Sequence, residues 1–167
     1  MPKFSTRTLT TMALLTALEI VLSRFLSISA WNTKIGFAFV PVALAAMLLG
    51  PLYAGLVAAL ADFVGAILFP VGAYFPGFTL TAFLIGLCLG LCLYKKQSFP
   101  RLLLAAALHQ GVLSLALNSL WISLLYGSPY GPLLLSRIPQ CALLAAVELA
   151  LSPLLWGLLP RIRHIAP

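Results

Sequence analysis

A single carboxylate, Asp62, lies inside the apolar stretch LADFVGAILFPVGAYFPGFT, which covers residues 60–79. An ionised carboxylate is costly in hydrocarbon, so an acidic side chain inside a membrane usually marks a functional site or an ion pair. A carboxylate can accept two neighbouring N–H donors, as an amino-substituted heterocycle presents them. The first chemistry that the sequence indicates is therefore recognition of a polar, hydrogen-bonding ligand.

The side chains that would support catalysis are poorly placed. The histidines are His109, in an apolar run, and His164, near the C-terminus, and no GxSxG, HExxH or paired-carboxylate motif accompanies them. Cys88, Cys92 and Cys141 lie in apolar runs and have neither the CxxC spacing nor neighbouring ligands of a metal site. The sequence also has no GxxxxGK phosphate loop. We therefore expect no enzymatic activity, no cofactor and no metal.

Composition places the chain in a membrane. Of its 167 residues, 62% are hydrophobic and 8% are charged, and the mean hydropathy is +1.10, whereas about a quarter of the residues in soluble domains are charged. The first apolar run contains Glu19 and Arg24 and lacks a cleavage pattern, so we expect it to remain as a helix. Breaks at Gly, Pro and charge clusters predict an all-α protein of one domain, residues 1–167, with six transmembrane helices. We expect these spans at residues 8–27, 35–50, 52–69, 77–94, 101–125 and 134–159.

The basic residues orient these helices. Six spans put both termini on one side, and the positive-inside rule assigns that side to the cytoplasm. Three of the ten basic residues, Arg24, Lys34 and Arg137, fall at the outer ends of spans one, two and six, against the rule. The net charge of +7 is therefore interpreted as membrane-flanking charge and not as a nucleic-acid-binding face. Seven basic residues flank the cytoplasmic side: Lys3, Arg7, Lys95, Lys96, Arg101, Arg161 and Arg163.

Helix geometry places three polar residues at one depth. At about 1.5 Å per residue, Asp62, Asn118 and Gln140 lie about 10 Å below the outer ends of their helices. This predicts an outward-facing pocket with a carboxylate and amides at its base and a basic rim, suited to a flat head with an anionic tail. Loop three, with its Gly and Pro residues, would act as a lid. We expect a set of aromatic residues above these three polar residues: Trp31, Tyr74, Phe75, Trp121, Tyr126 and Tyr130.

Each element also has a purely structural interpretation. Asp62 would be interhelical glue if it paired with Arg24 or Arg137, although we expect it to pair with donors on the ligand and not with a fixed cation. The aromatics fit an interfacial belt, and Lys34 and Arg137 are also in position to snorkel to phosphates. The remaining polar residues, Glu19, Glu148, His109 and Gln110, are expected mainly to make interhelical hydrogen bonds.

Small residues recur at four-residue spacing, which lets helices approach closely. Ala13 and Ala17 form such a strip in span one. Internal packing is the default interpretation, and contact with a partner protein is the alternative. The other strips are Ala54 with Ala58 in span three, and Gly86 with Gly90 in span four.

Four segments resemble the substrate-binding S components of energy-coupling factor (ECF) vitamin transporters, most closely the folate-specific members. The segments are ALLTALEIVLSRFLSI, GPLYAGLVAALADFVGAILFP, YFPGFTLTAFLIGL and NSLWISLLYG, and the resemblance covers nearly the whole chain. It implies a six-helix protein of the bacterial plasma membrane that captures folate or a reduced folate from outside and does not change it chemically. It also implies association with a transmembrane T protein and two ATPases.

The resemblance further implies roles for individual residues. Ala13 and Ala17 would meet the T protein, and the pterin is expected near Asp62 and Asn118, with Arg24 and the loop aromatics around it. Lys34 and Arg137 are expected at the ligand from charge placement alone. An S component for another flat vitamin or base, an intramembrane enzyme and a structural scaffold remain as alternatives.

Overall fold

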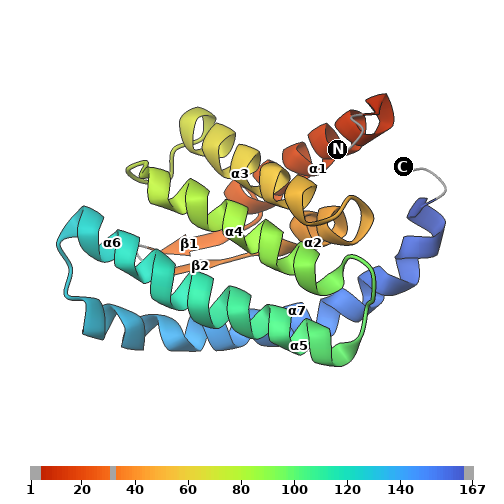
Figure 1. Ribbon diagram of the computed structural model, residues 1–167. Coiled ribbons are helices and arrows are strands. Elements are labelled where there is room, and N and C mark those ends of the chain that lie inside the picture. Colours follow the sequence, from red (N-terminus) through yellow and green to blue (C-terminus); the bar gives the residue numbers. More distant parts are fainter. Residues whose placement is uncertain (1–4, 31–32, 164–167) are drawn as a thin grey trace.

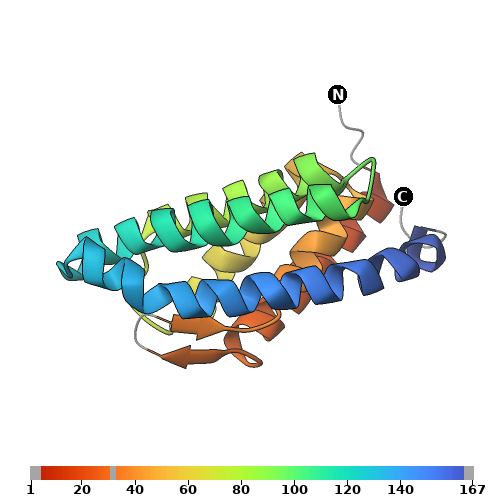
Figure 2. The same cartoon turned by 90° about the horizontal axis from the view of Figure 1, so that it is seen from below.

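The computed structural model describes residues 5–30 and 33–163, which form six helical rods and one β-hairpin (Figures 1 and 2). α5, the π-helical segment η1 and α6 follow one another without a break and make a single rod. The prediction of an all-α membrane protein with six helices is confirmed. The elements are α1 (Thr6–Arg24), β1 (Ile28–Ala30), β2 (Thr33–Ile35), α2 (Phe39–Leu48), α3 (Pro51–Leu68), α4 (Pro76–Leu93), α5 (Phe99–Ala106), η1 (Ala107–Leu117), α6 (Asn118–Tyr126) and α7 (Tyr130–Arg163).

The rods run roughly along one direction, so the bundle has two ends (Figures 1 and 2). α1 begins and α7 ends at one end, where the loop between α4 and α5 also lies. The α3–α4 loop and the α6–α7 turn lie at the other end, toward which the hairpin points. This arrangement matches the alternation of sides expected for six spans.

Proline and glycine set several helix ends. Pro51, Pro76 and Pro100 occupy the first turns of α3, α4 and α5, where the missing N–H removes no intrahelical hydrogen bond. Pro41 is the third residue of α2 and lies in its first turn for the same reason. Gly127 ends α6 with a left-handed φ of 66°, a conformation that glycine adopts at little cost.

The hairpin differs from the sequence prediction, which began the second span at residue 35. β1 and β2 pair antiparallel, with Ile28 opposite Ile35 and Ser29 opposite Lys34, and α2 starts only at Phe39. The sequence did not predict these strands because periodicity does not distinguish a strand from a helix in a short segment. The hairpin matters for function because it carries Lys34 into the bundle.

α3 and α4 pack closely against each other. A Cβ on Gly86 would collide with the backbone of Ala54, and one on Gly90 would collide with Pro51. Ala54 and Ala58 are 0% and 2% exposed. The small-residue strips of α3 and α4 therefore serve internal packing, as expected by default.

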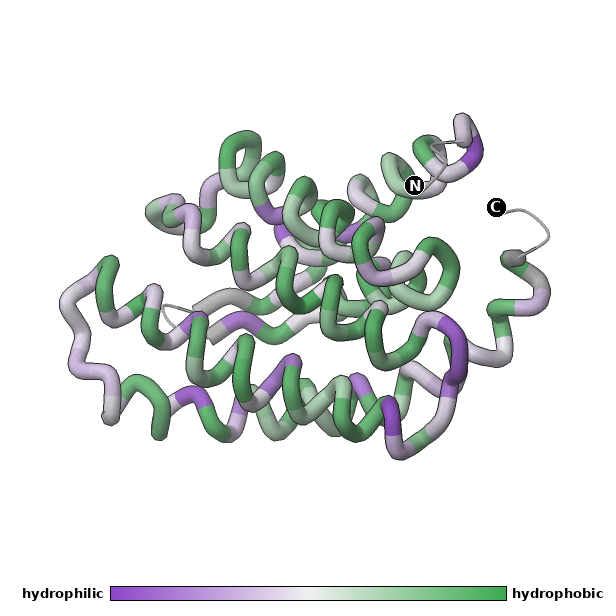
Figure 3. The backbone as a smooth tube through the Cα atoms, in the orientation of Figure 1, coloured by the Kyte–Doolittle hydropathy of each residue, from purple (hydrophilic) through white to green (hydrophobic). Residues whose placement is uncertain are grey.

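Apolar residues predominate along nearly every helix, as the colours of Figure 3 show, and many of them are exposed. Leucines with large exposed fractions include Leu14 at 68%, Leu91 at 68% and Leu135 at 69%. Four rods of the described chain are long and apolar enough to cross a membrane: Pro51–Leu68, Pro76–Leu93, Phe99–Tyr126 and Tyr130–Pro160. α2, with 10 residues, covers only about 15 Å, half of a hydrocarbon core of about 30 Å.

Candidate functional site

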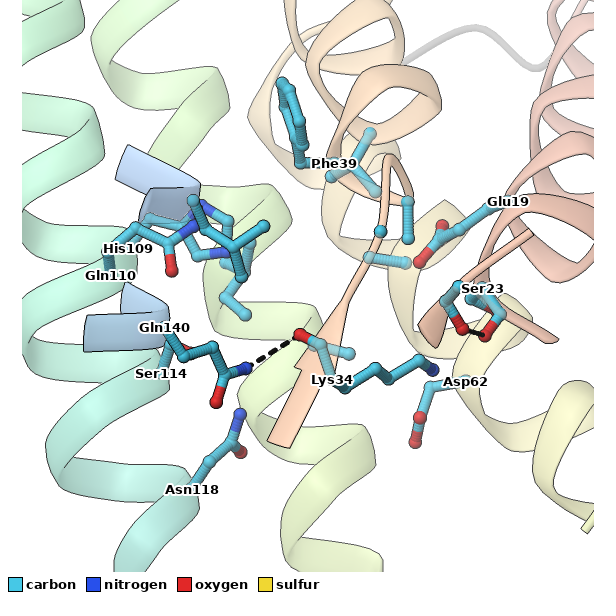
Figure 4. A pocket seen from close by; sticks show the side chains of 18 of the residues that line it. Glu19, Ser23, Lys34, Phe39, Asp62, His109, Gln110, Ser114, Asn118 and Gln140 are labelled. Carbon is cyan, nitrogen blue, oxygen red and sulfur yellow. Dashed lines mark hydrogen bonds between the residues drawn. The ribbon is translucent and has the colours of Figure 1, made fainter. Parts of the chain in front are cut away.

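A cavity of about 220 Å³ lies inside the bundle, and all six rods and the hairpin contribute to it (Figure 4). The carboxylates come from α1 and α3, and the amides come from η1, α6 and α7. We call Glu19 and Asp62 the carboxylate wall, and Gln110, Asn118 and Gln140 the amide wall. The lining residues are Glu19, Ser23, Ser27, Lys34, Gly36, Ala38, Phe39, Val42, Ala58, Asp62, Ala82, Ile85, His109, Gln110, Ser114, Asn118, Arg137, Gln140 and Leu144.

Asp62 has protein partners on both carboxylate oxygens. Arg24 Nη2 lies 3.8 Å from Asp62 Oδ1 and donates a hydrogen bond of 3.4 Å to the backbone carbonyl of Asp62. Thr79 donates to Oδ2 at 2.8 Å. The expectation that Asp62 has no fixed cation is therefore wrong. Gly65, one turn later, makes the contact possible, since a Cβ there would lie 2.9 Å from Arg24 Nε.

Glu19, the other carboxylate of this wall, has an oxygen without a hydrogen-bond partner in the described chain. It is 8% exposed and lines the cavity, and this oxygen is Oε2. The sequence alone predicts mainly interhelical hydrogen bonding for Glu19. The signal that would have identified it is Ser23, one turn along α1, which also lines the cavity.

The amide wall contains side-chain carbonyl oxygens that no described residue satisfies. Gln140 Nε2 donates at 2.7 Å to the backbone carbonyl of Lys34, and Gln110 Nε2 donates at 3.2 Å to Glu148. Within residues 5–30 and 33–163, the side-chain oxygens of Gln140, Gln110 and Asn118 are buried without a partner. The N–H groups of both glutamines are thus used by the protein, and their carbonyl groups remain for a ligand.

Two cations line the cavity. Arg137 is 5% exposed and lines the cavity, which argues against the alternative interpretation that it snorkels to lipid phosphates. It donates to Ser119 Oγ at 3.0 Å, and neither of the ion pairs found in the described part of the chain involves it. Lys34 extends from β2 toward Asp62 (Figure 4). Partial burial lowers the pKa of Lys34 from its usual value, and Arg24 also lowers it, whereas Asp62 and Glu19 raise it.

Tyr74, Phe75 and Trp121 are not among the residues that line the cavity. Phe75 and Trp121 pack with ring centroids 5.6 Å apart, and Trp121 Nε1 donates to Thr81 at 2.9 Å. Tyr74 Oη lies 3.2 Å from the Thr79 hydroxyl, which in turn donates to Asp62. This chain of contacts connects the α3–α4 loop to the carboxylate wall.

The remaining candidates are placed as follows. Tyr130 donates to the carbonyl of Ala116 at 3.1 Å and is not among the residues that line this cavity. Trp31 lies outside the described residues. Ala13 and Ala17 are exposed on α1, so their strip is not used for packing against the other described helices.

The chemistry available here is binding. The cavity combines unpartnered acceptor oxygens on two walls with a buried guanidinium, which suits a ligand that carries both N–H donors and negative charge. Within the part of the chain that the structure describes, no group of three His, Cys, Asp or Glu residues could hold a metal ion.

Comparison with known proteins gives concordant matches. Residues 7–156 match the family model of the ECF transporter substrate-specific component. The folate transporter FolT of Clostridium novyi (strain NT) is 40% identical over 152 residues, which cover 90% of this chain and 88% of that protein. FolT of Leuconostoc mesenteroides is 39% identical over 127 residues, 75% of this chain and 68% of that protein. A crystal structure of FolT bound with folic acid superposes with a TM-score of 0.85 at 36% identity and covers 90% of this chain and 93% of that one.

Proposed function

This chain belongs to the substrate-specific components of ECF transporters, and we propose that it captures folate from outside the cell for import. It is a multi-pass membrane protein of a transporter family and not an enzyme. The observation that carries the proposal is a set of buried acceptor oxygens without partners in the described chain, on the cavity-lining residues Glu19, Gln110, Asn118 and Gln140. A pterin head has an amino group and ring N–H donors to meet them, and the glutamate tail has carboxylates for Arg137 and Lys34.

The size of the cavity fits the head of such a ligand. Sites for whole drug-sized ligands measure about 300–1,000 Å³, and this cavity of about 220 Å³ is smaller. The two-ring head would occupy it, and the tail would be directed toward Arg137 and Lys34. Tyr74 and Phe75 on the α3–α4 loop, and Trp121 on α6 behind it, would then approach the ligand when the loop closes.

The family relationship supports a role as one subunit of a complex. We propose that a transmembrane T protein and two ATP-binding subunits supply the energy for import. The exposed strip of Ala13 and Ala17 supports contact with the T protein, because small residues allow a second membrane helix to approach closely.

A titration of the detergent-purified protein tests the ligand. Folic acid is added while tryptophan fluorescence is followed, with thiamin and riboflavin as controls. Saturable quenching by micromolar or lower folic acid, and by neither control, is the expected result. Saturation by another vitamin would preserve the transporter class and exclude folate, and no response to any of them would exclude this function.

A further inference from the structure

Glu148 of α7 lies behind the cavity and contacts two residues that line it. It is 1% exposed. Its Oε2 lies 2.8 Å from His109 Nδ1 and 3.2 Å from Gln110 Nε2. His109 and Gln110 line the cavity and Glu148 does not, so Glu148 can influence a ligand only through them.

These contacts use one hydrogen-bonding group of each residue. A carboxylate oxygen that accepts from the imidazole places a proton on Nδ1 of His109, which leaves Nε2 as the ring nitrogen free to meet a ligand. The amide nitrogen of Gln110 is engaged by Glu148, and its Oε1 is buried with no partner among residues 5–30 and 33–163. We call His109 and Gln110 the cavity floor; both belong to η1.

The conformation of η1 brings adjacent residues to one partner. Its backbone makes i→i+5 hydrogen bonds, as the contact from the Asn118 N–H to the Leu113 carbonyl shows. Such wide turns are rare and occur frequently at functional sites. The wide turn thus accounts for two neighbouring side chains contacting one carboxylate oxygen.

We propose that Glu148 is a positioning residue that determines ligand specificity: it holds His109 as the neutral Nδ1–H tautomer and leaves the amide oxygen of Gln110 for the ligand, so that the cavity floor offers acceptors only. The floor then selects a ligand head with neighbouring N–H donors and rejects one that presents a lone pair there. Rejection follows because two facing acceptors, buried and without a proton between them, are left unsatisfied. This inference rests on the proposed function and specifies which edge of the head is recognised: the 2-amino group and N3–H of the pyrimidinone ring.

Two probes distinguish donor from acceptor at that edge. Folic acid carries a hydrogen on N3, whereas aminopterin, its 4-amino analogue, has a lone pair on N3. Dissociation constants for both are measured with the wild-type protein and with Glu148→Leu, Glu148→Gln and Ser152→Ala. Ser152 is the matched control because it is 1% exposed, lies one turn further along α7 and does not line the cavity.

The wild type and Ser152→Ala are expected to prefer folic acid by about ten-fold or more. Glu148→Leu is expected to bring the ratio of the two constants to within about three-fold, because the floor groups are free to turn. Glu148→Gln is expected to restore the preference, since its amide oxygen can accept the same two hydrogen bonds. If Glu148→Leu does not fold, Gln110→Met, which removes one floor acceptor, must lower the ratio in its place.

Three results would overturn the inference: equal wild-type affinity for both probes, an unchanged ratio in folded Glu148→Leu or Gln110→Met, or loss of the ratio in Glu148→Gln. Tight folic acid binding accompanied by any of these leaves the proposed function intact. If the wild type binds neither probe at micromolar concentration, the proposed function itself fails.

Discussion

Gln140 on α7 donates its amide hydrogen to the backbone carbonyl of Lys34, at 2.7 Å, across 106 positions of sequence. This hydrogen bond attaches the hairpin to the last helix and places the Lys34 side chain over the cavity. Gln140→Leu is expected to speed hydrogen exchange of the backbone amides of residues 33–35 and to weaken folic acid binding about five- to ten-fold, the value of one hydrogen bond.

Gln97→Leu is the control for that change. Gln97 also donates to a backbone carbonyl, that of Leu93 at 3.0 Å, but in the α4–α5 loop at the other end of the bundle. It is expected to leave binding unchanged. Normal exchange and affinity in Gln140→Leu would show that the hairpin does not depend on this hydrogen bond.

Asp62→Asn should retain shape while it removes charge. The amide oxygen can still accept from Thr79, but the ion pair with Arg24 and charge-assisted bonds to a ligand are lost. Folic acid binding is expected to weaken by roughly 1.5–3 kcal/mol, about ten-fold or more, measured by titration. Thr79→Val, which removes the hydrogen bond alone, is expected to cost less. A lower melting temperature for Asp62→Asn with normal affinity would assign Asp62 to structure only.

Arg137→Met is expected to separate stability from binding. The guanidinium is buried at 5% exposure and has no carboxylate partner in the described chain, so its removal is expected to leave the melting temperature in detergent unchanged or higher. Folic acid affinity is expected to fall about ten-fold or more, since a charged hydrogen bond contributes roughly 1.5–3 kcal/mol. Arg101→Met, at an exposed position on α5, serves as the control. Destabilisation with unaltered affinity would contradict an anion-binding role.

Ala13→Leu and Ala17→Leu test the exposed strip on α1. Because both side chains face away from the packed core, folic acid binding is expected to remain within about two-fold of wild type. Uptake of labelled folate by cells that also produce the T protein and ATPases is expected to be lost. Leu91→Phe, on the exposed face of α4, is expected to alter neither property. Reduced binding in the α1 variants would show that the strip packs internally.

The sequence predicted the six rods and their order because apolar length and proline and glycine breaks act locally. Depth was equally accessible: counting residues put Asp62, Asn118 and Gln140 in one layer, and the structure brings all three to one cavity. Helix rise is nearly constant, so depth needs no knowledge of packing.

The sequence did not predict which side of each helix points into the bundle. The sequence predicts mainly interhelical hydrogen bonds for Glu19 and His109, yet both line the cavity. Which side of a helix points inward depends on all the helices packed around it. The Arg24 contact to Asp62 was discounted for a related reason. It depends on the absence of a side chain at Gly65, and only the packed helices show that α1 crosses there.

The lining of the cavity begins at Glu19 on the first helix and ends at Leu144 on the last. A ribosome must therefore synthesise most of α7, and the membrane must receive it, before any binding site exists. The vitamin cannot guide the insertion of the earlier helices, and it can stabilise only a chain that is already nearly complete. Truncation within α7 before residue 137 would remove Arg137, Gln140 and the support of Glu148 together, leaving five inserted helices without a site.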